Sequence, residues 1–227
     1  MAGTGQLKLL AMWASPFVMR VKLALGFKGL SYEDVEEDLF GGKSELLLQS
    51  NPVHKKVPVL LHNGKPVCES QIIVQYIEEA FPSCPGPSLL PTNPYERAIA
   101  RFWGAYIDDK SARGKTEEEK AEGQKLTAVA VENMEAAFKE ISKGKPFFGG
   151  DTVGYLDVTL GALVSWVQAA EKLYGLRLFD ATRSPLLNAW AERFAALDTA
   201  KAVLADVDKL VEYAKHRQAA AAAASSN

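Results

Sequence analysis

Residues 51–71 of this 227-residue chain read NPVHKKVPVLLHNGKPVCESQ: two short apolar runs, a turn between them, and the start of a helix. Proline has no N–H for a β-ladder, so Pro58 predicts an edge strand or a special turn at the first run. If the Val57–Pro58 bond is cis, the N–H and C=O of Val57 turn outward, toward the backbone of a ligand. Asn63-Gly64 favours a two-residue hairpin turn, which fixes the register of the flanking strands.

The acid–serine pair Glu69-Ser70 stands where a predicted helix over residues 71–81 begins. The first turn of a helix has free N–H groups and the positive end of the helix dipole, which together bind a carboxylate. Residues 51–71 therefore predict a site that pairs with a ligand's backbone and holds its carboxylate. The expected ligand is peptide-like and anionic.

The second half of this site lies upstream, where a predicted strand over residues 7–12 leads into Trp13-Ala14-Ser15-Pro16. Apolar residues then recur at helical spacing, beginning with Phe17. Ser15 suits the N-cap of this helix, and Pro16 suits its first position, where the missing N–H is not needed. One interpretation is that Ser15 only caps the helix; the other is that it also meets the ligand.

The order of the elements indicates the fold class. A strand, the Ser-Pro helix, a strand over residues 31–36, the Val-Pro strand, a hairpin and a helix follow one another, as in a thioredoxin-like domain. In that fold, sulfur chemistry takes place at the N-terminus of the first helix, often at a Cys-x-x-Cys motif. Ser15 occupies that place here. A serine cannot form a mixed disulfide, but its hydroxyl can donate a hydrogen bond to another molecule's thiolate.

Composition argues against several classes of function. The net charge of −2, from 26 Lys and Arg and 28 Asp and Glu, includes no basic block of the kind that binds nucleic acid. No apolar run approaches a membrane span, and the N-terminus lacks the features of a signal peptide. Cys68 and Cys84 are too few for a disulfide framework and have no metal-ligand neighbours. We therefore expect no metal, no membrane and a cytoplasmic location.

A helix-rich second half is predicted after a linker. Residues 83–93 are rich in Pro, Ser and Gly, which gives a first domain over residues 1–82 and an all-helical domain over 94–227. Asp157 is expected to tie down the free N–H groups of a buried central helix. The tail could extend the last helix or fray. The expected helices cover 95–110, Thr116 to about 141, 154–173, 185–197 and 199–217, before a low-complexity tail over 218–227.

Four motifs follow one another: SPFVMRV at residues 15–21, NPVHKKVPVL at 51–60, KPVCES at 65–70, and FGGD with GYLD at 148–157. In this order they resemble the soluble glutathione S-transferases and, within them, the plant tau class. The resemblance covers the chain apart from its first residues and the alanine-rich tail. It implies a thioredoxin-like domain followed by an all-α helical bundle, and a homodimer.

The resemblance also implies the site, position by position. Glutathione is the co-substrate, no cofactor is permanently bound, and Ser15 is the catalytic hydroxyl. A supporting network includes Arg20 and Asp108; the alternative is that Arg20 simply pairs with Glu69 or Glu79. The remaining implied contacts are Lys43 and Lys56 at the glycyl carboxylate, Val57 and Pro58 beside the cysteinyl backbone, and Glu69 and Ser70 at the γ-glutamyl end.

One hydroxyl can supply the energy that this role needs. A free thiol has a pKa near about 8.5, and lowering it by about two units needs roughly 2.7 kcal/mol. A well-aimed donor in a shielded site is worth roughly 2.7–4 kcal/mol, and a helix N-terminus adds roughly 0.3–1 kcal/mol. Ser15 and the helix end therefore suffice without a metal or a general base.

The acceptor substrate is expected to be apolar and electrophilic. Phe17 follows the Ser-Pro pair, and Trp166 matches, by resemblance, an aromatic wall of the tau-class acceptor pocket; the alternative for Trp166 is core packing. The chain departs from the tau pattern at residues 111–115, SARGK, where it is shorter. This departure predicts a wider mouth, at which Arg113 or Lys115 favours anionic acceptors.

Three interpretations of function stay open at this point. The chain is a conjugating enzyme of detoxification with glutathione peroxidase side activity, a non-catalytic carrier of hydrophobic ligands, or an interaction module. The intact set of implied glutathione contacts favours the enzyme over the module. The serine at position 15 argues against thiol transfer and dehydroascorbate reduction, which need a cysteine there.

Overall fold

The computed structural model describes residues 5–38, 41–110 and 117–225. Its first half contains a sheet in the order β2-β1-β3-β4, in which β2 is parallel to β1 and the other neighbours are antiparallel. This is the predicted thioredoxin-like arrangement. The elements are β1 (Leu7–Ala11), α1 (Pro16–Phe27), β2 (Glu33–Glu36), α2 (Glu45–Ser50), β3 (Val59–His62), β4 (Lys65–Cys68) and α3 (Ser70–Ala80).

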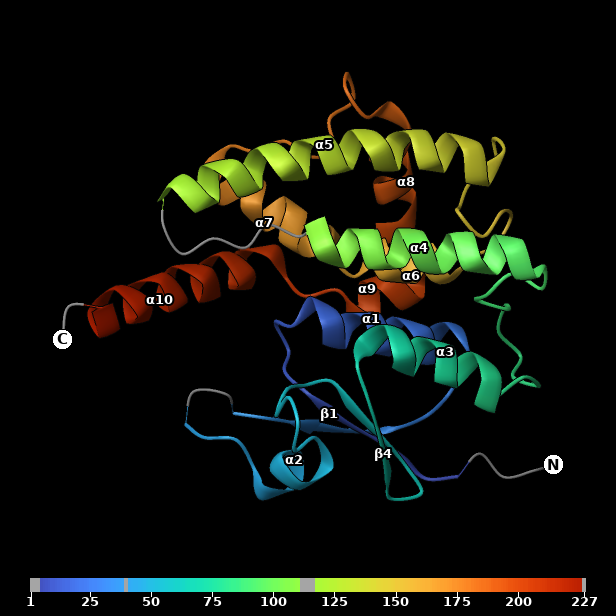
Figure 1. Ribbon diagram of the computed structural model, residues 1–227, viewed down its shortest axis with the longest axis vertical. Coiled ribbons are helices and arrows are strands. Elements are labelled where there is room, and N and C mark those ends of the chain that lie inside the picture. Colours follow the sequence, from blue (N-terminus) through green and yellow to red (C-terminus); the bar gives the residue numbers. More distant parts are fainter. Residues whose placement is uncertain (1–4, 39–40, 111–116, 226–227) are drawn as a thin grey trace.

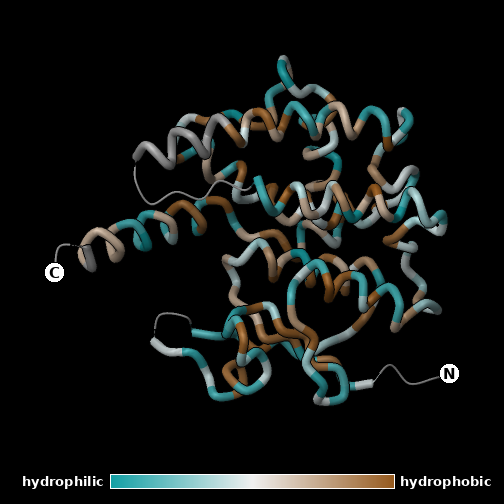
Figure 2. Tube along the Cα trace, viewed as in Figure 1, coloured by the Kyte–Doolittle hydropathy of each residue, from teal (hydrophilic) through white to brown (hydrophobic). Residues whose placement is uncertain are grey.

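The two faces of the sheet carry different helices, because successive strand residues point to opposite sides. On one face Leu9 and Leu60 join the main core with α1 and α3. On the other face Leu10 and Val59 pack with Leu47 of α2. Figure 1 shows α1 and α3 between the sheet and the helical half, and Figure 2 shows hydrophobic segments where these layers meet. The start of α1 therefore lies where the two halves of the chain adjoin.

The hairpin has the geometry that its sequence predicts. The Val57–Pro58 peptide bond is cis. Asn63 and Gly64 have φ angles of 51° and 76°, which a two-residue turn of the primed type requires. β3 and β4 pair directly across this turn, and their register brings the chain to Glu69 at the start of α3.

The helices of the second half are α4 (Pro94–Lys110), α5 (Glu117–Ser142), α6 (Tyr155–Gly161), α7 (Val164–Tyr174), α8 (Pro185–Ala195), α9 (Asp198–Val203) and α10 (Val207–Ser225). Two of the predicted helices are therefore each divided. Between α6 and α7 the N–H of Leu163 donates to the oxygen of Leu160, three residues back, so the turn is tighter than in an α-helix. Between α9 and α10 Leu204 is extended, and Asp206 caps α10 by accepting from the N–H of Lys209 at 2.9 Å.

The carboxylate of Asp157 joins three segments of the helical half. It is fully buried and accepts the N–H groups of Phe148, Gly149 and Gly154 at 3.0, 2.9 and 2.8 Å. The indole N–H of Trp190 on α8 donates to it at 2.7 Å. The predicted cap at the start of α6 is therefore present, and Asp157 also holds the preceding loop and α8.

The segment between α3 and α4 is tied to the first half by Lys28. This ammonium is buried and donates to Glu78 at 3.1 Å and to the oxygen of Pro87 at 3.4 Å. Glu78 in turn accepts from the Ser88 hydroxyl and the Leu89 N–H, at 2.6 and 3.0 Å. The alanine-rich tail extends α10 (Figure 1). Across the described ranges, no helix is both long and apolar enough to span a membrane.

Candidate active site

Ser15 stands at the N-terminus of α1, as predicted. Its Oγ accepts the N–H of Val18 at 3.3 Å, and the side chain is half-buried. A serine hydroxyl has two acceptor lone pairs and one proton. Because the cap uses a lone pair, the proton of Ser15 stays available to a ligand at the end of α1. The two interpretations of Ser15 are thus compatible with each other.

Hydrogen bonds to β2, to α7 and within the loop itself hold the segment that carries Ser15. The N–H of Trp13 donates to Glu36 Oε1 at 2.7 Å, and the N–H of Ser15 donates to the oxygen of Met12 at 2.9 Å. The indole Nε1 of Trp166 donates to the oxygen of Ala14 at 2.8 Å. Since Glu36 belongs to β2 and Trp166 to α7, both halves of the chain position the hydroxyl.

Glu69 and Ser70 stand at the start of α3. Glu69 has φ 69° and ψ 117°, a left-handed backbone region that favours glycine. Such a conformation costs on the order of 1–3 kcal/mol and is typical of functional sites. The Glu69 side chain is exposed, whereas Ser70 is buried. Both residues meet the positive end of α3, where an anion is stabilised.

Arg20 connects Ser70 to Asp108. Its guanidinium is fully buried; Nη1 donates to Ser70 Oγ at 2.8 Å and to Asp108 Oδ2 at 3.1 Å, and Nη2 donates to Asp108 Oδ1 at 2.7 Å. The partner of Arg20 is therefore Asp108 of α4 rather than Glu69 or Glu79. This bidentate pair crosses between the two halves of the chain beside the start of α3.

The other residues predicted to contact glutathione lie in two loops. Lys43 is exposed, next to Ser44, which caps α2. Lys56 is also exposed, and its backbone oxygen accepts from Asn51 Nδ2 at 2.9 Å. Val57 is half-buried. Both ammonium groups are thus at the surface, and Val57 directly precedes the cis bond.

Two family models match the chain. The model for the glutathione S-transferase N-terminal domain covers residues 5–79, and the model for the C-terminal domain covers residues 96–193. The chain belongs to the glutathione S-transferase family. A probable glutathione S-transferase, GSTU6 of Oryza sativa subsp. japonica, is 56% identical over 224 residues, which cover 94% of each chain.

Solved structures of glutathione S-transferases agree with this assignment. The tau-class enzyme MiGSTU from mango, Mangifera indica, matches with a TM-score of 0.86 and 46% identity, over 94% of this chain and 99% of its own. Rice GST1 (OsGSTU1), solved in complex with glutathione, matches with a TM-score of 0.82 and 38% identity, over 93% and 96%. The predicted tau class and fold class are confirmed, and the chain is a glutathione transferase.

The aromatic residues predicted to wall the acceptor pocket of this glutathione S-transferase lie on α1 and α7. Phe17 is half-buried, with the guanidinium carbon of Arg20 5.4 Å from its ring centroid. Trp166 is half-buried and packs with Met12 and Ala14. Tyr213 of α10, which the sequence did not indicate, stands edge-on to Trp13 and Trp166 at 5.4 and 6.4 Å between ring centroids. Arg113 and Lys115 lie outside the described residues.

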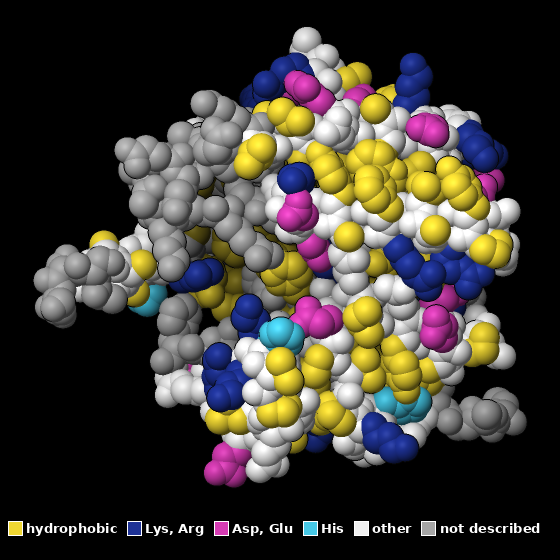
Figure 3. Space-filling model, in the orientation of Figure 1, with side chains coloured by type: hydrophobic (Ala, Val, Ile, Leu, Met, Phe, Trp, Pro, Cys, Tyr) yellow, Lys and Arg dark blue, Asp and Glu magenta, His cyan; other side chains and the backbone are white. Residues whose placement is uncertain are grey.

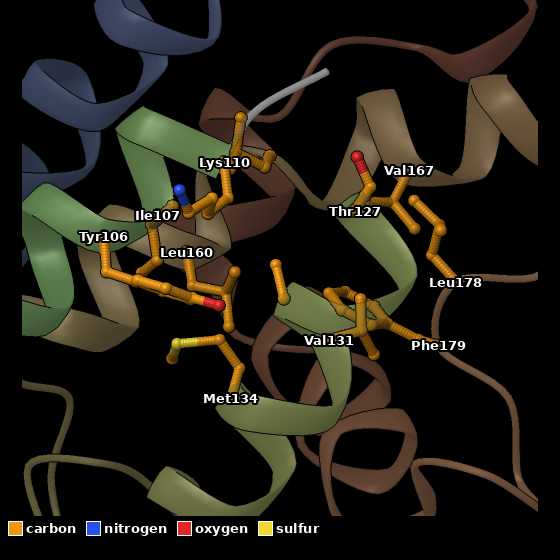
Figure 4. A pocket seen from close by; sticks show the side chains of 12 residues that line it. Tyr106, Ile107, Lys110, Thr127, Val131, Met134, Leu160, Val167, Leu178 and Phe179 are labelled. Atoms are coloured by element: carbon orange, nitrogen blue, oxygen red, sulfur yellow. The ribbon is translucent and has the colours of Figure 1, made fainter. Parts of the chain in front are cut away.

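A separate apolar pocket lies within the helical half of this transferase (Figure 4). It is lined by side chains of α4, α5, α6 and α7 and of the segment after α7, among them Tyr106, Met134 and Val167. Its lining includes neither Ser15 nor Trp166. The pocket therefore shares no lining residue with the predicted acceptor wall of Phe17 and Trp166.

The sequence did not predict that Gln71 and Tyr155 join the Arg20 network. Gln71 Nε2 donates to Asp108 Oδ2 at 2.6 Å and to the oxygen of Gly104 at 2.7 Å. The hydroxyl of Tyr155 donates to Gln71 Oε1 at 2.7 Å. One sequence signal for Gln71 was available: it is a polar residue directly before Ile, Ile and Val in the first turn of α3. Tyr155 gave no such signal, since it looked like an ordinary core residue at a helix start.

Proposed function

We propose that the Ser15 hydroxyl donates to the sulfur of bound glutathione and stabilises its thiolate, which then attacks hydrophobic electrophiles. The observation that carries this proposal is the capping geometry: Ser15 Oγ accepts from Val18, so its one proton is available for the sulfur. The relative solved with glutathione supports the tripeptide as the ligand.

The remaining contacts of the tripeptide follow from its chemistry. The γ-glutamyl carboxylate would meet Ser70 and the N–H groups at the start of α3, and its ammonium would meet the exposed carboxylate of Glu69. The glycyl carboxylate would meet the ammonium groups of Lys43 and Lys56, and the cysteinyl backbone would pair with Val57. Pro58 sets the direction of the chain at that point.

The proposed reaction is a substitution at carbon. With an aromatic halide, a carbon–sulfur bond forms and the carbon–halogen bond breaks, and the halide leaves with the bonding electron pair. The thiol proton passes to solvent before the attack. Phe17 and Trp166 would supply the apolar wall against which the acceptor lies. In a side reaction the same thiolate would attack an organic hydroperoxide: the O–O bond breaks, the alcohol leaves, and the sulfur becomes a sulfenic acid, which a second glutathione converts to glutathione disulfide and water.

The replacement Ser15→Ala tests the role of the hydroxyl. We expect the pKa of the bound thiol, followed by the ultraviolet absorbance of the thiolate, to rise by about two units toward that of free glutathione. Asn93→Ala is the matched control, because Asn93 caps α4 through the N–H groups of Tyr95 and Glu96, at 2.9 and 3.2 Å. It should leave the thiol pKa unchanged. A thiol pKa in Ser15→Ala equal to that of the parent chain would rule out the proposed role.

Turnover separates the enzyme from a carrier. An enzyme of this mechanism consumes glutathione and a chloronitrobenzene together and releases chloride in equal amounts. A carrier binds both without consuming either. The Ser15→Ala variant should keep glutathione binding and lose most of the turnover, because Ser15 acts on the sulfur rather than on the ends of the tripeptide.

We also propose that a second copy of the chain covers an apolar surface in the assembled enzyme. Ile72 of α3, Phe102 of α4 and Val129 of α5 are 54%, 59% and 51% exposed. Figure 3 shows hydrophobic side chains gathered over the region of α4 and α5 on the face that it draws. Light scattering after size exclusion should give twice the mass of the 24.7 kDa chain. The variant Phe102→Asp should shift that mass toward one chain.

A further inference from the structure

We infer that Gln71 and Tyr155 are positioning residues for glutathione, because they fix Asp108, through it Arg20, and so the hydroxyl of Ser70. The inference rests on the proposed role of Ser70 at the γ-glutamyl end. It assigns a binding function to two residues that would otherwise be contacts between the halves of the chain.

A continuous series of hydrogen bonds leads from Tyr155 in the helical half to Ser70 at the N-terminus of α3. Tyr155 donates to Gln71 at 2.7 Å, and Gln71 donates to Asp108 at 2.6 Å. Arg20 donates to Asp108 and then to Ser70 at 2.8 Å. Because Arg20 occupies one lone pair of Ser70 Oγ, the hydroxyl proton is directed away from Arg20. In that orientation the Ser70 hydroxyl can donate to a carboxylate of the ligand.

Asp108 needs a second anchor to hold this geometry. Its side chain is 27% exposed, whereas Arg20 is fully buried. Gln71 supplies the anchor, since its Nε2 also donates to the oxygen of Gly104, one helical turn before Asp108. Both donors and the acceptor of the Gln71 amide thus have partners on α4 and α6. An amide held in this way has only one favourable orientation, and so does the carboxylate that it contacts.

The backbone of α4 makes room for this arrangement. A Cβ atom at Gly104 would lie 2.8 Å from Cε1 of Tyr155 and 3.0 Å from Oε1 of Gln71. A glycine in a helix interior lowers the stability of the helix by about 1 kcal/mol relative to alanine. Burial raises the pKa of Tyr155 to about 12, so its hydroxyl stays protonated and acts as a donor. Gly104 therefore provides the space in which Tyr155 and Gln71 meet.

The test measures glutathione binding and stability side by side. Calorimetric titration of the 227-residue chain with glutathione should show that Gln71→Leu raises Kd about tenfold, since a hydrogen bond to a charged group is lost. Tyr155→Phe should raise Kd about threefold, and it serves as a second variant if Gln71→Leu does not fold. Arg101→Met is the matched control, because it removes the 2.6 Å bond to Gln75 across the same α3–α4 contact. It should lower Tm and leave Kd unchanged.

A double-mutant cycle shows whether Gln71 acts through Asp108. We expect Gln71→Leu to add nothing to the loss in Kd already caused by Asp108→Asn. The inference fails if Gln71→Leu and Arg101→Met lower Tm alike while Kd stays at the parent value, or if the two losses in Kd add. Failure of the proposed function looks different: the parent chain then does not bind glutathione, or Ser70→Ala binds it as tightly as the parent does.

Discussion

The indole N–H of Trp166 donates to the backbone oxygen of Ala14 at 2.8 Å, so a residue of the helical half holds the peptide unit that leads to Ser15. The sequence left two interpretations of Trp166, an acceptor wall and core packing. Its position against the apolar cluster of Met12, Ala14, Ala169 and Leu210 agrees with core packing. The hydrogen bond adds a third role, because it fixes the loop that presents the Ser15 hydroxyl.

Replacement of Trp166 by Phe separates the ring from the hydrogen bond. The phenyl ring keeps most of the packing, but the Ala14 oxygen loses its donor, and a net hydrogen bond is worth about 1 kcal/mol. We expect kcat/KM to fall about fivefold with a small rise in the thiol pKa. Trp13→Phe is the control, since Trp13 stands edge-on to the same Tyr213 and belongs to the same loop. If both variants lose activity equally, the ring rather than the N–H carries the effect.

The buried carboxylate of Asp157 should be the most sensitive polar group of the helical half. Asp157→Asn keeps the size but replaces one acceptor oxygen by an NH₂ group, which faces donors already aimed at that position. A buried donor left without a partner costs about 1–3 kcal/mol, so we expect the free energy of unfolding in urea to fall by about 3 kcal/mol. Burial raises the pKa of Asp157, whereas its four donors oppose that rise.

A surface carboxylate in the same region provides the comparison. Asp151 pairs with Lys145 at 3.0 Å, and both side chains are largely exposed. Asp151→Asn should change the free energy of unfolding by less than about 0.5 kcal/mol. A loss of similar size in the two variants would mean that burial does not set the cost at Asp157.

Local signals in the sequence predicted the elements that build the site. The hairpin turn at Asn63 and Gly64, the cap at Ser15 and the start of α3 each depend on residues within one turn of one another. Such features follow from backbone geometry alone, so they do not depend on the rest of the fold. The short helix α2 was missed, although Ser44 before Glu45 is a capping signal.

The breaks in two predicted helices could not be derived in the same way. Ala162 and Leu163 are good helix formers, and only the packing of α6 and α7 shows that the turn is tightened there. A Cβ at Gly161 would lie 2.3 Å from the ring of Phe194, so α8 approaches α6 closely at that point. The hydrogen bonds from Gln71 to Asp108 and from Tyr155 to Gln71 are tertiary contacts as well. Asp108 and Tyr155 lie 37 and 84 residues from Gln71 in the chain.

The ion pair of Lys28 and Glu78 predicts how stability depends on pH. Burial by itself raises the pKa of Glu78, but hydrogen bonds from Ser88, Leu89 and Lys28 outweigh it, and the pKa lies below its ordinary value of 4.5. The unfolded chain therefore binds this proton more tightly than the folded chain does. At pH values above the ordinary pKa of 4.5, ionised Glu78 stabilises the fold. This contribution is lost as the pH falls through the lowered pKa of the folded chain.

Glu78→Gln tests this dependence. At about pH 7 the variant should lose about 2 kcal/mol in the free energy of unfolding, because a buried ammonium loses its charged partner. As the pH falls through the lowered pKa of Glu78, the parent chain loses the same contribution by protonation, so the difference between the two chains should shrink. Glu79→Gln, at an exposed neighbouring position, should follow the parent chain throughout. A difference that stays constant down to the lowest pH would show that the charge of Glu78 is not what stabilises this segment.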